Sequence, residues 1–396
     1  MKLNNLWWGP PKKFSPDIEE RKISWLELFY DLVYVIVISR STQHFAAHPD
    51  FDGFFYYVFF FGMIFWGWLN GSMYYDLHGT PGIRSNLMTL WQMLAVAALA
   101  VTQEFKHDVE YHYYTLALIF LQVFITYLWW SVGFYDKDHR RLNIPLNICY
   151  LVNIILLVIA LNIHSSFKPA LYWLILIINF IPAFFINSIF RKTNRMLDIS
   201  SSMVERLGLF TIIVFGECIL GVINGMIHFE GHSKHTWIAF GLAILIVFSL
   251  WFIFFSMIAD RKCKPGFLQG YLFQLMFVPS LITLGMMGAT FSLMLNADVT
   301  GTVLSTNIRL LFGGSVAVFI ICIYLLSVFL EYDRTFGNPK KIFGLILLPT
   351  AALLALLTCL FPDLDTVYFL LMVFCILLAM IVVLTYGWYK KVMTGN

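Results

Sequence analysis

Runs of about twenty apolar residues recur along this chain from Trp25 to its end, and they limit its possible folds more than any other feature. A helix of about twenty residues, rising 1.5 Å per residue, crosses a hydrocarbon layer of about 30 Å. Only 12% of the 396 residues are charged, against roughly 25% in an ordinary soluble domain. We therefore predict an all-α, polytopic transmembrane helical bundle that has the lipid bilayer as its main partner.

The apolar pattern predicts about twelve spans, preceded by a polar, Pro-containing leader at 1–24 that does not have the form of a cleavable signal peptide. The ninth span is long enough to be tilted or broken at Pro279. The predicted spans are 25–46, 54–75, 85–105, 113–134, 142–163, 168–189, 206–227, 235–258, 267–294, 309–330, 341–361 and 367–389.

The Lys and Arg residues fall unevenly on the two sides of such a bundle. Counted by alternate connections, 21 lie on the side of the two termini, four lie on the other side, and Arg40 lies within the first span. Positive residues favour the cytoplasmic side of a membrane, so we expect both termini to be cytoplasmic.

An even number of spans is consistent with two parallel six-helix halves, at 25–190 and 207–396, joined by a basic cytoplasmic connection at 191–206. Short similarities between the halves support a duplication: LFYDLV is similar to LFTIIV, and SMYYD to SMIAD. Parallel repeats are a common plan for transporters.

Two carboxylates stand in the first predicted helix, where each buried charge costs at least about 2.5 kcal/mol. At about 100° per residue, one helical face carries Ser24, Glu27, Asp31, Tyr34 and Ser41, and Arg40 lies roughly opposite. Asp31 therefore needs a partner from another helix, a cation, a proton or water. Glu27 lies closer to the interface, where a hydrated carboxylate at the positive end of a helix is an alternative.

The seventh predicted helix carries a second acid, Glu217, close to the expected midplane. A lone Glu at this depth must be protonated, paired or bound to a cation. Gly221, Asn224 and His228 share its face, and Gly221 with Gly225 forms a GxxxG motif that allows another helix to approach closely. We predict Asp31 and Glu217, with Glu27, Tyr34, Asn224 and His228, as residues that bind an ion or substrate.

The remaining polar residues indicate less specific roles. We interpret buried amides, such as Asn70, Asn143 and Asn179, mainly as contacts between helices. Most histidines fall on the predicted outer side, where a metal-binding or acid-sensing surface would use them. Solvated histidines in short loops are the favoured interpretation, because no spacing matches a metal-ligand motif, and the six cysteines indicate neither disulfides nor a metal site. We therefore expect no cofactor, no metal and no nucleic-acid partner, and the sequence sets no oligomeric state.

Two segments resemble the bacterial low temperature requirement A family. WLELFYDLVYVIVIS, at 25–39, is similar to its opening acidic and aromatic signature, and ERLGLFTIIVFGECIL, at 205–220, to its second signature. The resemblance covers nearly the whole chain and implies a multi-pass protein of the bacterial inner membrane. Tyr30 and Tyr34 stand where the family usually has Phe, and Cys218 where Ser is common. The family motif falls on Glu27, Asp31, Glu205, Arg206, Gly216 and Glu217.

A second resemblance concerns one loop. SMIADRKCKPG is similar to the A-D-R-x-G-R-K loop of major facilitator transporters, which also have twelve helices and cytoplasmic termini. The corresponding loop after the second span, YYDLHGTPGIRS, lacks the basic run, and both loops lack the family's Gly pattern.

These observations favour a secondary transporter, or an ion- or proton-translocating protein, with a small ion or small molecule as its substrate. One alternative is a membrane-embedded sensor or assembly factor, in which each buried acid has a fixed partner; Arg206 could serve as that partner if the two signature helices pack together. Another alternative is a membrane enzyme with a metal or lipid substrate. We do not expect an enzyme, because no nucleophile with an identifiable base is apparent.

Overall fold

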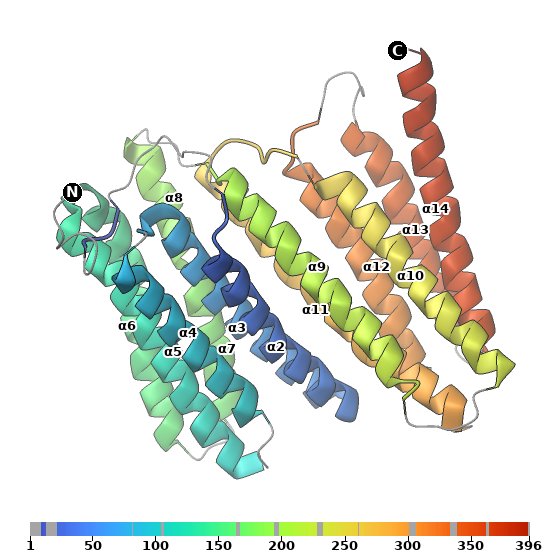
Figure 1. Ribbon diagram of the computed structural model, residues 1–396, viewed down its shortest axis with the longest axis horizontal. Helices are drawn as coiled ribbons and strands as arrows, with labels where there is room; N and C mark the ends of the chain where they lie inside the picture. Colours follow the sequence, from blue (N-terminus) through green and yellow to red (C-terminus); the bar gives the residue numbers. More distant parts are fainter. Residues whose placement is uncertain are drawn as a thin grey trace. The chain divides into compact units, whose positions relative to one another are not determined.

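The computed structural model describes residues 9–12, 22–80, 82–103, 107–163, 167–193, 198–227, 233–259, 261–300, 306–332, 339–361 and 364–394, and it is almost entirely α-helical (Figure 1). The helices are α2 (Trp25–Ala47), α3 (Phe51–His78), α4 (Ile83–Thr102), α5 (His107–Tyr135), α6 (Lys137–Asn162), α7 (Lys168–Phe180), α8 (Pro182–Thr193), α9 (Ser201–Asn224), α10 (Lys234–Ile258), α11 (Phe267–Thr300), α12 (Thr306–Val328), α13 (Pro339–Leu360) and α14 (Thr366–Thr394).

The observed helices begin and end within two turns of the predicted spans. The sixth predicted span, 168–189, is the exception, because the structure divides it into α7 and α8 at Ile181. The next residue, Pro182, has no backbone N–H and cannot continue the hydrogen-bond ladder. Eleven helices in the described part of the chain are long and apolar enough to cross a membrane, with α7 and α8 taken together as one span. Helix α2, which carries Glu27, Asp31 and Arg40, is not among them.

Proline has a different effect in α11. The predicted alternative of a break at Pro279 was wrong, because α11 is continuous from Phe267 to Thr300. Hydroxyl groups bond to the backbone carbonyls around the proline. Ser280 Oγ donates to the Met276 carbonyl at 2.8 Å, and Thr283 Oγ1 lies 3.0 Å from the Pro279 carbonyl.

Helix α6 shows the polarity expected of a helix in lipid. Its exposed face is apolar and follows the spacing of one helical side, with Ile144, Ile148, Leu151, Ile155 and Ile159. Its buried face carries polar side chains, namely Asn143, Tyr150 and Asn153. A soluble helix has the opposite arrangement, so α6 is built to face hydrocarbon outside and polar partners inside.

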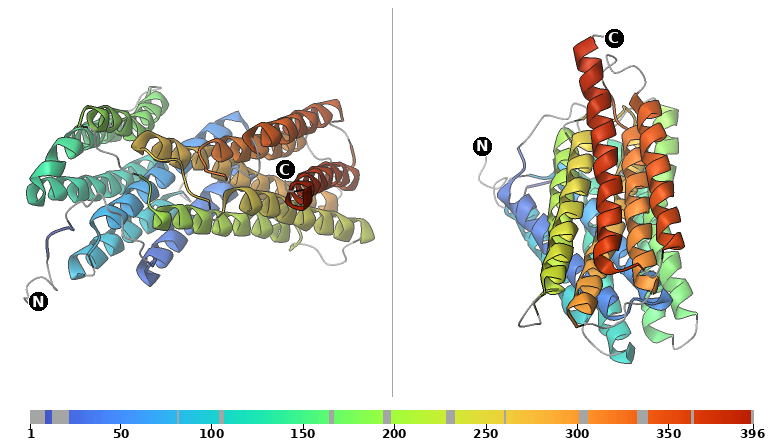
Figure 2. Two further views of the ribbon diagram at one scale, coloured as in Figure 1. Left: turned by 90° about the horizontal axis from the view of Figure 1, so that it is seen from above. Right: turned by 90° about the vertical axis from the view of Figure 1, so that its right-hand side faces the viewer.

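The chain forms two compact units. Unit 1 comprises Met1–His44, Phe54–Phe210 and Pro265–Tyr271, and unit 2 comprises Phe45–Gly53, Thr211–Lys264 and Leu272–Asn396. Within unit 1, α5 packs against α4 and α6, and α6 also contacts α7 and α8; within unit 2, α12 packs against α13, and α14 packs against α10 and α13 (Figure 2). The duplication of two six-helix halves stays a prediction.

The core of unit 1 is formed largely by aromatic residues of α3. Phe60, Phe61, Phe65, Trp66 and Trp68 are all almost completely buried. Large aromatic side chains bury much area and prefer tilted or edge-to-face contacts. Trp68 packs in this way against Phe210 of α9, with ring centroids 4.5 Å apart. This packing brings the first part of α9, which belongs to unit 1 up to Phe210, against α3 and positions the charged residues described next.

Candidate functional site

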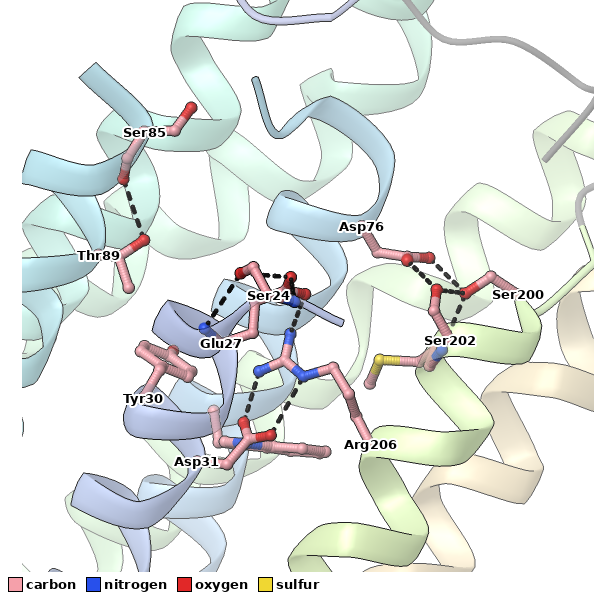
Figure 3. A network of polar contacts seen from close by, with 12 residues as sticks. Ser24, Glu27, Tyr30, Asp31, Asp76, Ser85, Thr89, Ser200, Ser202 and Arg206 are labelled. Carbon is pink, nitrogen blue, oxygen red and sulfur yellow. Dashed lines mark hydrogen bonds and ion pairs between the residues drawn. The ribbon is translucent and has the colours of Figure 1, made fainter. Parts of the chain in front are cut away.

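A buried ion-pair cluster joins the beginning of α2 to the beginning of α9 within unit 1. Glu27 and Asp31 lie one turn apart on α2, and Arg206 extends from the second turn of α9 toward both of them (Figure 3). Arg206 Nη2 lies 2.5 Å from Asp31 Oδ1, its Nε lies 3.3 Å from Asp31 Oδ2, and its Nη1 lies 3.4 Å from Glu27 Oε2. The exposed fractions are 2% for Glu27, 1% for Asp31 and 1% for Arg206.

The geometry at Asp31 is the strongest part of this cluster. Arg206 bonds to both of its carboxylate oxygens, a two-point arrangement that guanidinium groups make and ammonium groups cannot. A third donor, Trp68 Nε1, bonds to Asp31 Oδ1 at 2.7 Å. Asp31 therefore accepts hydrogen bonds from two different helices, α9 and α3.

Aromatic rings form two walls around the guanidinium. Arg206 Cζ lies 5.7 Å from the ring centroid of Trp68 and 5.8 Å from that of Tyr30. A cation at this distance from an aromatic face is attracted by the ring, and more strongly where water is excluded. The rings thus help to hold a positive charge at a position where bulk solvent cannot hydrate it.

Glu27 also closes the N-terminus of α2. Its Oε1 accepts hydrogen bonds from the Ser24 backbone N–H at 3.0 Å and from Ser24 Oγ at 2.8 Å. In return, the Glu27 N–H lies 3.3 Å from Ser24 Oγ. This is the reciprocal capping box of the pattern S-x-x-E. The alternative that Glu27 is a hydrated carboxylate is therefore wrong. Its side chain is buried, and one carboxylate oxygen bonds to Ser24 while the other bonds to Arg206.

Tyr34, another predicted site residue, lies about one turn after Asp31 in α2. Its hydroxyl is 3.1 Å from that of Tyr30, which in turn lies 3.1 Å from Gln92 Oε1 on α4. Both tyrosines are buried. Gly71 of α3 makes this possible, because a Cβ there would overlap the Tyr30 hydroxyl and the Gln92 amide. Tyr30 and Tyr34 thus place two buried hydroxyl groups next to the carboxylates of α2.

A second polar group ties α3 to the start of α9. Ser200 Oγ donates to Asp76 Oδ2 at 2.5 Å, and Ser202 Oγ donates to Asp76 Oδ1 at 2.6 Å (Figure 3). The Met203 N–H donates to Ser200 Oγ at 3.0 Å, so Ser200 also caps α9. These bonds fix the first turn of the helix that carries Arg206.

The other predicted site residues belong to unit 2 or lie outside the residues that the structure describes. Glu217 and Asn224 are half-buried on α9, whereas His228 lies outside the described residues. A Cβ on Gly221 would overlap the backbone of Gly288 on α11, and a Cβ on Gly225 would come within 2.9 Å of the Ser292 carbonyl. The GxxxG pattern therefore does mark a close helix contact. Glu205 of the second signature is exposed.

The chemistry available at the cluster follows from its charges. With both carboxyl groups ionised, Glu27, Asp31 and Arg206 together carry a formal charge of −1. Burying an ion is expensive unless pairing and hydrogen bonds compensate for the lost hydration. Such a cluster suits the binding of a proton or cation, or the fixed joining of two helices. Within the described residues, no three His, Cys, Asp or Glu side chains come together in a way that could hold a metal ion.

Trp68 is a site residue that the sequence analysis missed. A tryptophan in a run of Phe and Trp residues is typical of packing, and only the structure shows its N–H bonded to Asp31. The contact of Gln92 on α4 with Tyr30 was not predicted either. No spacing within α3 or α4 connects these residues to the acids of α2.

Comparisons with known proteins agree with this description. Residues 22–383 match the family model described as "Bacterial low temperature requirement A protein (LtrA)". The match includes α2 with Glu27 and Asp31 and α9 with Arg206 and Glu217. A search of curated proteins finds no match.

Proposed function

The chain belongs to the bacterial low temperature requirement A family, and we propose that it acts as a secondary transporter or ion-translocating protein of the bacterial inner membrane. The observation that carries this proposal is the sharing of one buried guanidinium, that of Arg206, by two carboxyl groups, those of Glu27 and Asp31. A proton or cation would bind at these carboxyl groups and change how strongly α2 holds α9.

The electrostatic energy lost on protonation is large enough to couple protonation to a change of conformation. Two unit charges 4 Å apart attract by about 4 kcal/mol at an effective dielectric constant of about 20. Protonating one carboxyl group removes one such attraction and leaves the other in place. A change of about 4 kcal/mol corresponds to nearly a thousandfold shift between two conformations. The second carboxylate would keep Arg206 paired during that shift, so the guanidinium is never left buried and alone.

The proposed arrangement in the membrane follows the distribution of Lys and Arg. Both termini would lie in the cytoplasm, with 21 basic residues on that side and four on the other. The Glu27, Asp31 and Arg206 cluster would then lie near the cytoplasmic end of unit 1. Glu217, further along α9, would be a second proton or cation site deeper in the membrane.

Flux measurements in liposomes test this proposal. A pH-sensitive dye inside the liposomes would report proton movement after a jump in external pH or in Na⁺ or K⁺ concentration. We expect Asp31→Asn and Glu217→Gln each to slow the initial rate by about tenfold or more, which corresponds to at least ~1.4 kcal/mol in the limiting barrier. Asp52→Asn is the matched control, because Asp52 is an exposed acid at the start of α3, and its flux should equal that of the parent protein.

Each of the two variants tests the role of one acid. Unaltered flux in a folded Glu217→Gln variant would remove Glu217 from the mechanism, and unaltered flux in both variants would contradict the proposed role of the two acids. Flux no greater than that of empty liposomes would contradict the transport proposal. All variants should be compared at equal amounts of folded protein in the membrane, because Asp31 also contributes to packing.

A membrane-embedded sensor or assembly factor is the second candidate. It is favoured by the burial of the cluster, because the three charged side chains are at most 2% exposed and already paired. In a protein of this kind, Asp31→Asn would lower the stability of the fold, and no proton or cation flux would exceed that of empty liposomes.

A further inference from the structure

Positively charged residues gather at one end of unit 2, where α10 and α12 end and α13 begins (Figure 1). The connection after α10 is the ADRKCKPG segment, which resembles a loop of major facilitator transporters and has no role in the proposed function. Its cations and those at the start of α13 form what we call the basic cluster, namely Arg261, Lys262, Lys264, Lys340 and Lys341.

Backbone hydrogen bonds hold the connection after α10 in place. It runs antiparallel to the segment that follows α12. The Lys264 N–H donates to the Phe329 carbonyl at 2.8 Å, and the Glu331 N–H donates to the Lys262 carbonyl at 2.9 Å. The cations of this connection are therefore fixed at the end of α12.

Two side chains of the basic cluster are positioned by contacts with the helices. Arg261 Nε donates to the Met257 carbonyl at 3.0 Å, and Arg261 Cζ lies 4.5 Å from the ring centroid of Tyr332. Lys340 Nζ donates to the Val328 carbonyl, at the end of α12, at 3.1 Å. A guanidinium has five N–H donors and an ammonium group has three, so both side chains keep donors for a further acceptor.

The positive charges of the basic cluster are poorly balanced by acidic side chains. In the part of the chain that the structure describes, none of its five cations forms an ion pair. Lys340 lies beside Lys264, so two like charges come close together, and Glu331 is the acid that also acts on Lys340. The first turn of α13 carries no acidic residue, although a helix N-terminus favours negative charge. An anion among these side chains would offset the repulsion.

The depth of the basic cluster favours a lipid as the source of that anion. The apolar span of α10 ends at Ile258 and that of α13 begins at Lys340, so the cations lie at the level of lipid headgroups. On α13, Leu345 and Leu348 follow Lys341 on one helical face and are 67% and 39% exposed. Basic residues at the cytoplasmic end of transmembrane helices attract anionic lipids, and the proposed orientation places this end in the cytoplasm.

We propose that the basic cluster binds the phosphate group of an anionic phospholipid, with an acyl chain along the exposed leucines of α13. This inference does not depend on the transport function. The lipid would bridge the ends of α10, α12 and α13 within unit 2. A headgroup with a net negative charge would be preferred to one whose phosphate is neutralised by a quaternary ammonium group, because that group would meet five like charges.

Native mass spectrometry of the full chain in detergent solution, titrated with dioleoyl phosphatidylglycerol, tests the proposal. We expect binding at least about tenfold tighter than that of dioleoyl phosphatidylcholine, which has the same chains and no net charge. Lys264→Gln with Lys340→Gln should weaken binding of phosphatidylglycerol by about thirtyfold, because each basic residue near an anionic surface contributes about a factor of five. Lys234→Gln is the matched control, because Lys234 is exposed at the other end of α10, and its affinity should equal that of the parent protein.

A second pair of substitutions keeps the test decisive if the first pair disturbs folding. Lys262 and Lys341 are exposed, so their joint replacement by Gln should leave the fold intact and still weaken binding, whereas their joint replacement by Arg should preserve it. Equal affinity for the two phospholipids would overturn the proposal, as would unchanged binding in both Gln double variants. Glycerol 3-phosphate has the phosphate without the chains and should compete poorly. Competition by glycerol 3-phosphate at the concentration of the lipid would overturn the assignment to a phospholipid.

Discussion

Replacement of Arg206 by Gln should destabilise the protein by about 3 to 5 kcal/mol, the usual cost of breaking a buried ion pair by removing one partner. The variant keeps Glu27 and Asp31 buried one turn apart on α2 without the guanidinium that contacts both. Arg206→Lys should recover only part of the loss, because an ammonium group cannot bond to both Asp31 oxygens in the same way. Denaturant titration of the purified protein in bicelles would measure the change.

The matched control for this variant is Arg40→Gln. Arg40 lies on α2 as well, but it is exposed and bonds to Gln43 of its own helix at 3.4 Å. Its replacement should change the free energy of unfolding by less than about 0.5 kcal/mol. If Arg206→Gln cost no more than Arg40→Gln, the cluster would contribute nothing to holding α2 against α9. A double variant, Asp31→Asn with Arg206→Gln, should cost less than the sum of the two single changes, because the groups interact.

Gly221→Ala should be the second large effect, and it concerns unit 2. A Cβ at Gly221 would overlap the carbonyl and Cα of Gly288, which are backbone atoms and cannot rotate away. The two helices would have to separate, at a cost of about 1 to 3 kcal/mol for overpacking. Loss of this contact would also disturb the neighbouring bond from Cys218 Sγ to the Leu284 carbonyl, which is 3.0 Å long. The same unfolding titration would detect the change.

Gly216→Ala provides a control of opposite sign on the same helix. No described atom lies within 4 Å of the position that its Cβ would take. Alanine is better than glycine inside a helix by roughly 0.8 to 1 kcal/mol. Gly216→Ala should therefore leave stability unchanged or raise it. Equal effects of the two substitutions would mean that α9 and α11 do not pack closely at Gly221.

Most of the fold could be predicted from the sequence because the thickness of a membrane sets helix length. The twelve predicted spans correspond to helices α2 to α14, with α7 and α8 in the place of one span, and all of them except α2 are long and apolar enough to cross a membrane. The effect of individual prolines was harder to predict. Pro182 ends one helix and starts another, whereas Pro279 lies within a continuous helix that has Ser280 and Thr283 beside it. The apolar pattern does not distinguish these two outcomes.

The candidate site could be predicted only in part. Helical spacing places Glu27, Asp31 and Tyr34 on one face, and all three side chains are buried. Arg206 is 175 residues from Asp31, so its contact depends on which helices are neighbours. From the sequence, Arg206 is a partner of these acids only if the two signature helices pack together.

The partners of the buried amides of unit 1 were not predicted. Asn70, Asn143 and Asn179 were interpreted as contacts between helices, and their hydrogen bonds do join helices. Amides of α3, α6 and α7, namely Asn70, Asn143 and Asn179, lie around one hollow because those three helices come together there. No periodicity along a single helix contains that information.

The most direct test of the central claim, that Glu27 and Asp31 take up a proton beside Arg206, is infrared difference spectroscopy of the protein in lipid between alkaline and acidic pH. A protonated carboxyl group gives a carbonyl stretching band that a carboxylate lacks. We predict that such a band appears on acidification and is lost or shifted in Asp31→Asn and in Glu27→Gln, while Asp52→Asn leaves it unchanged. A difference spectrum in the carboxyl region that is the same in the parent protein and in both cluster variants would contradict the claim.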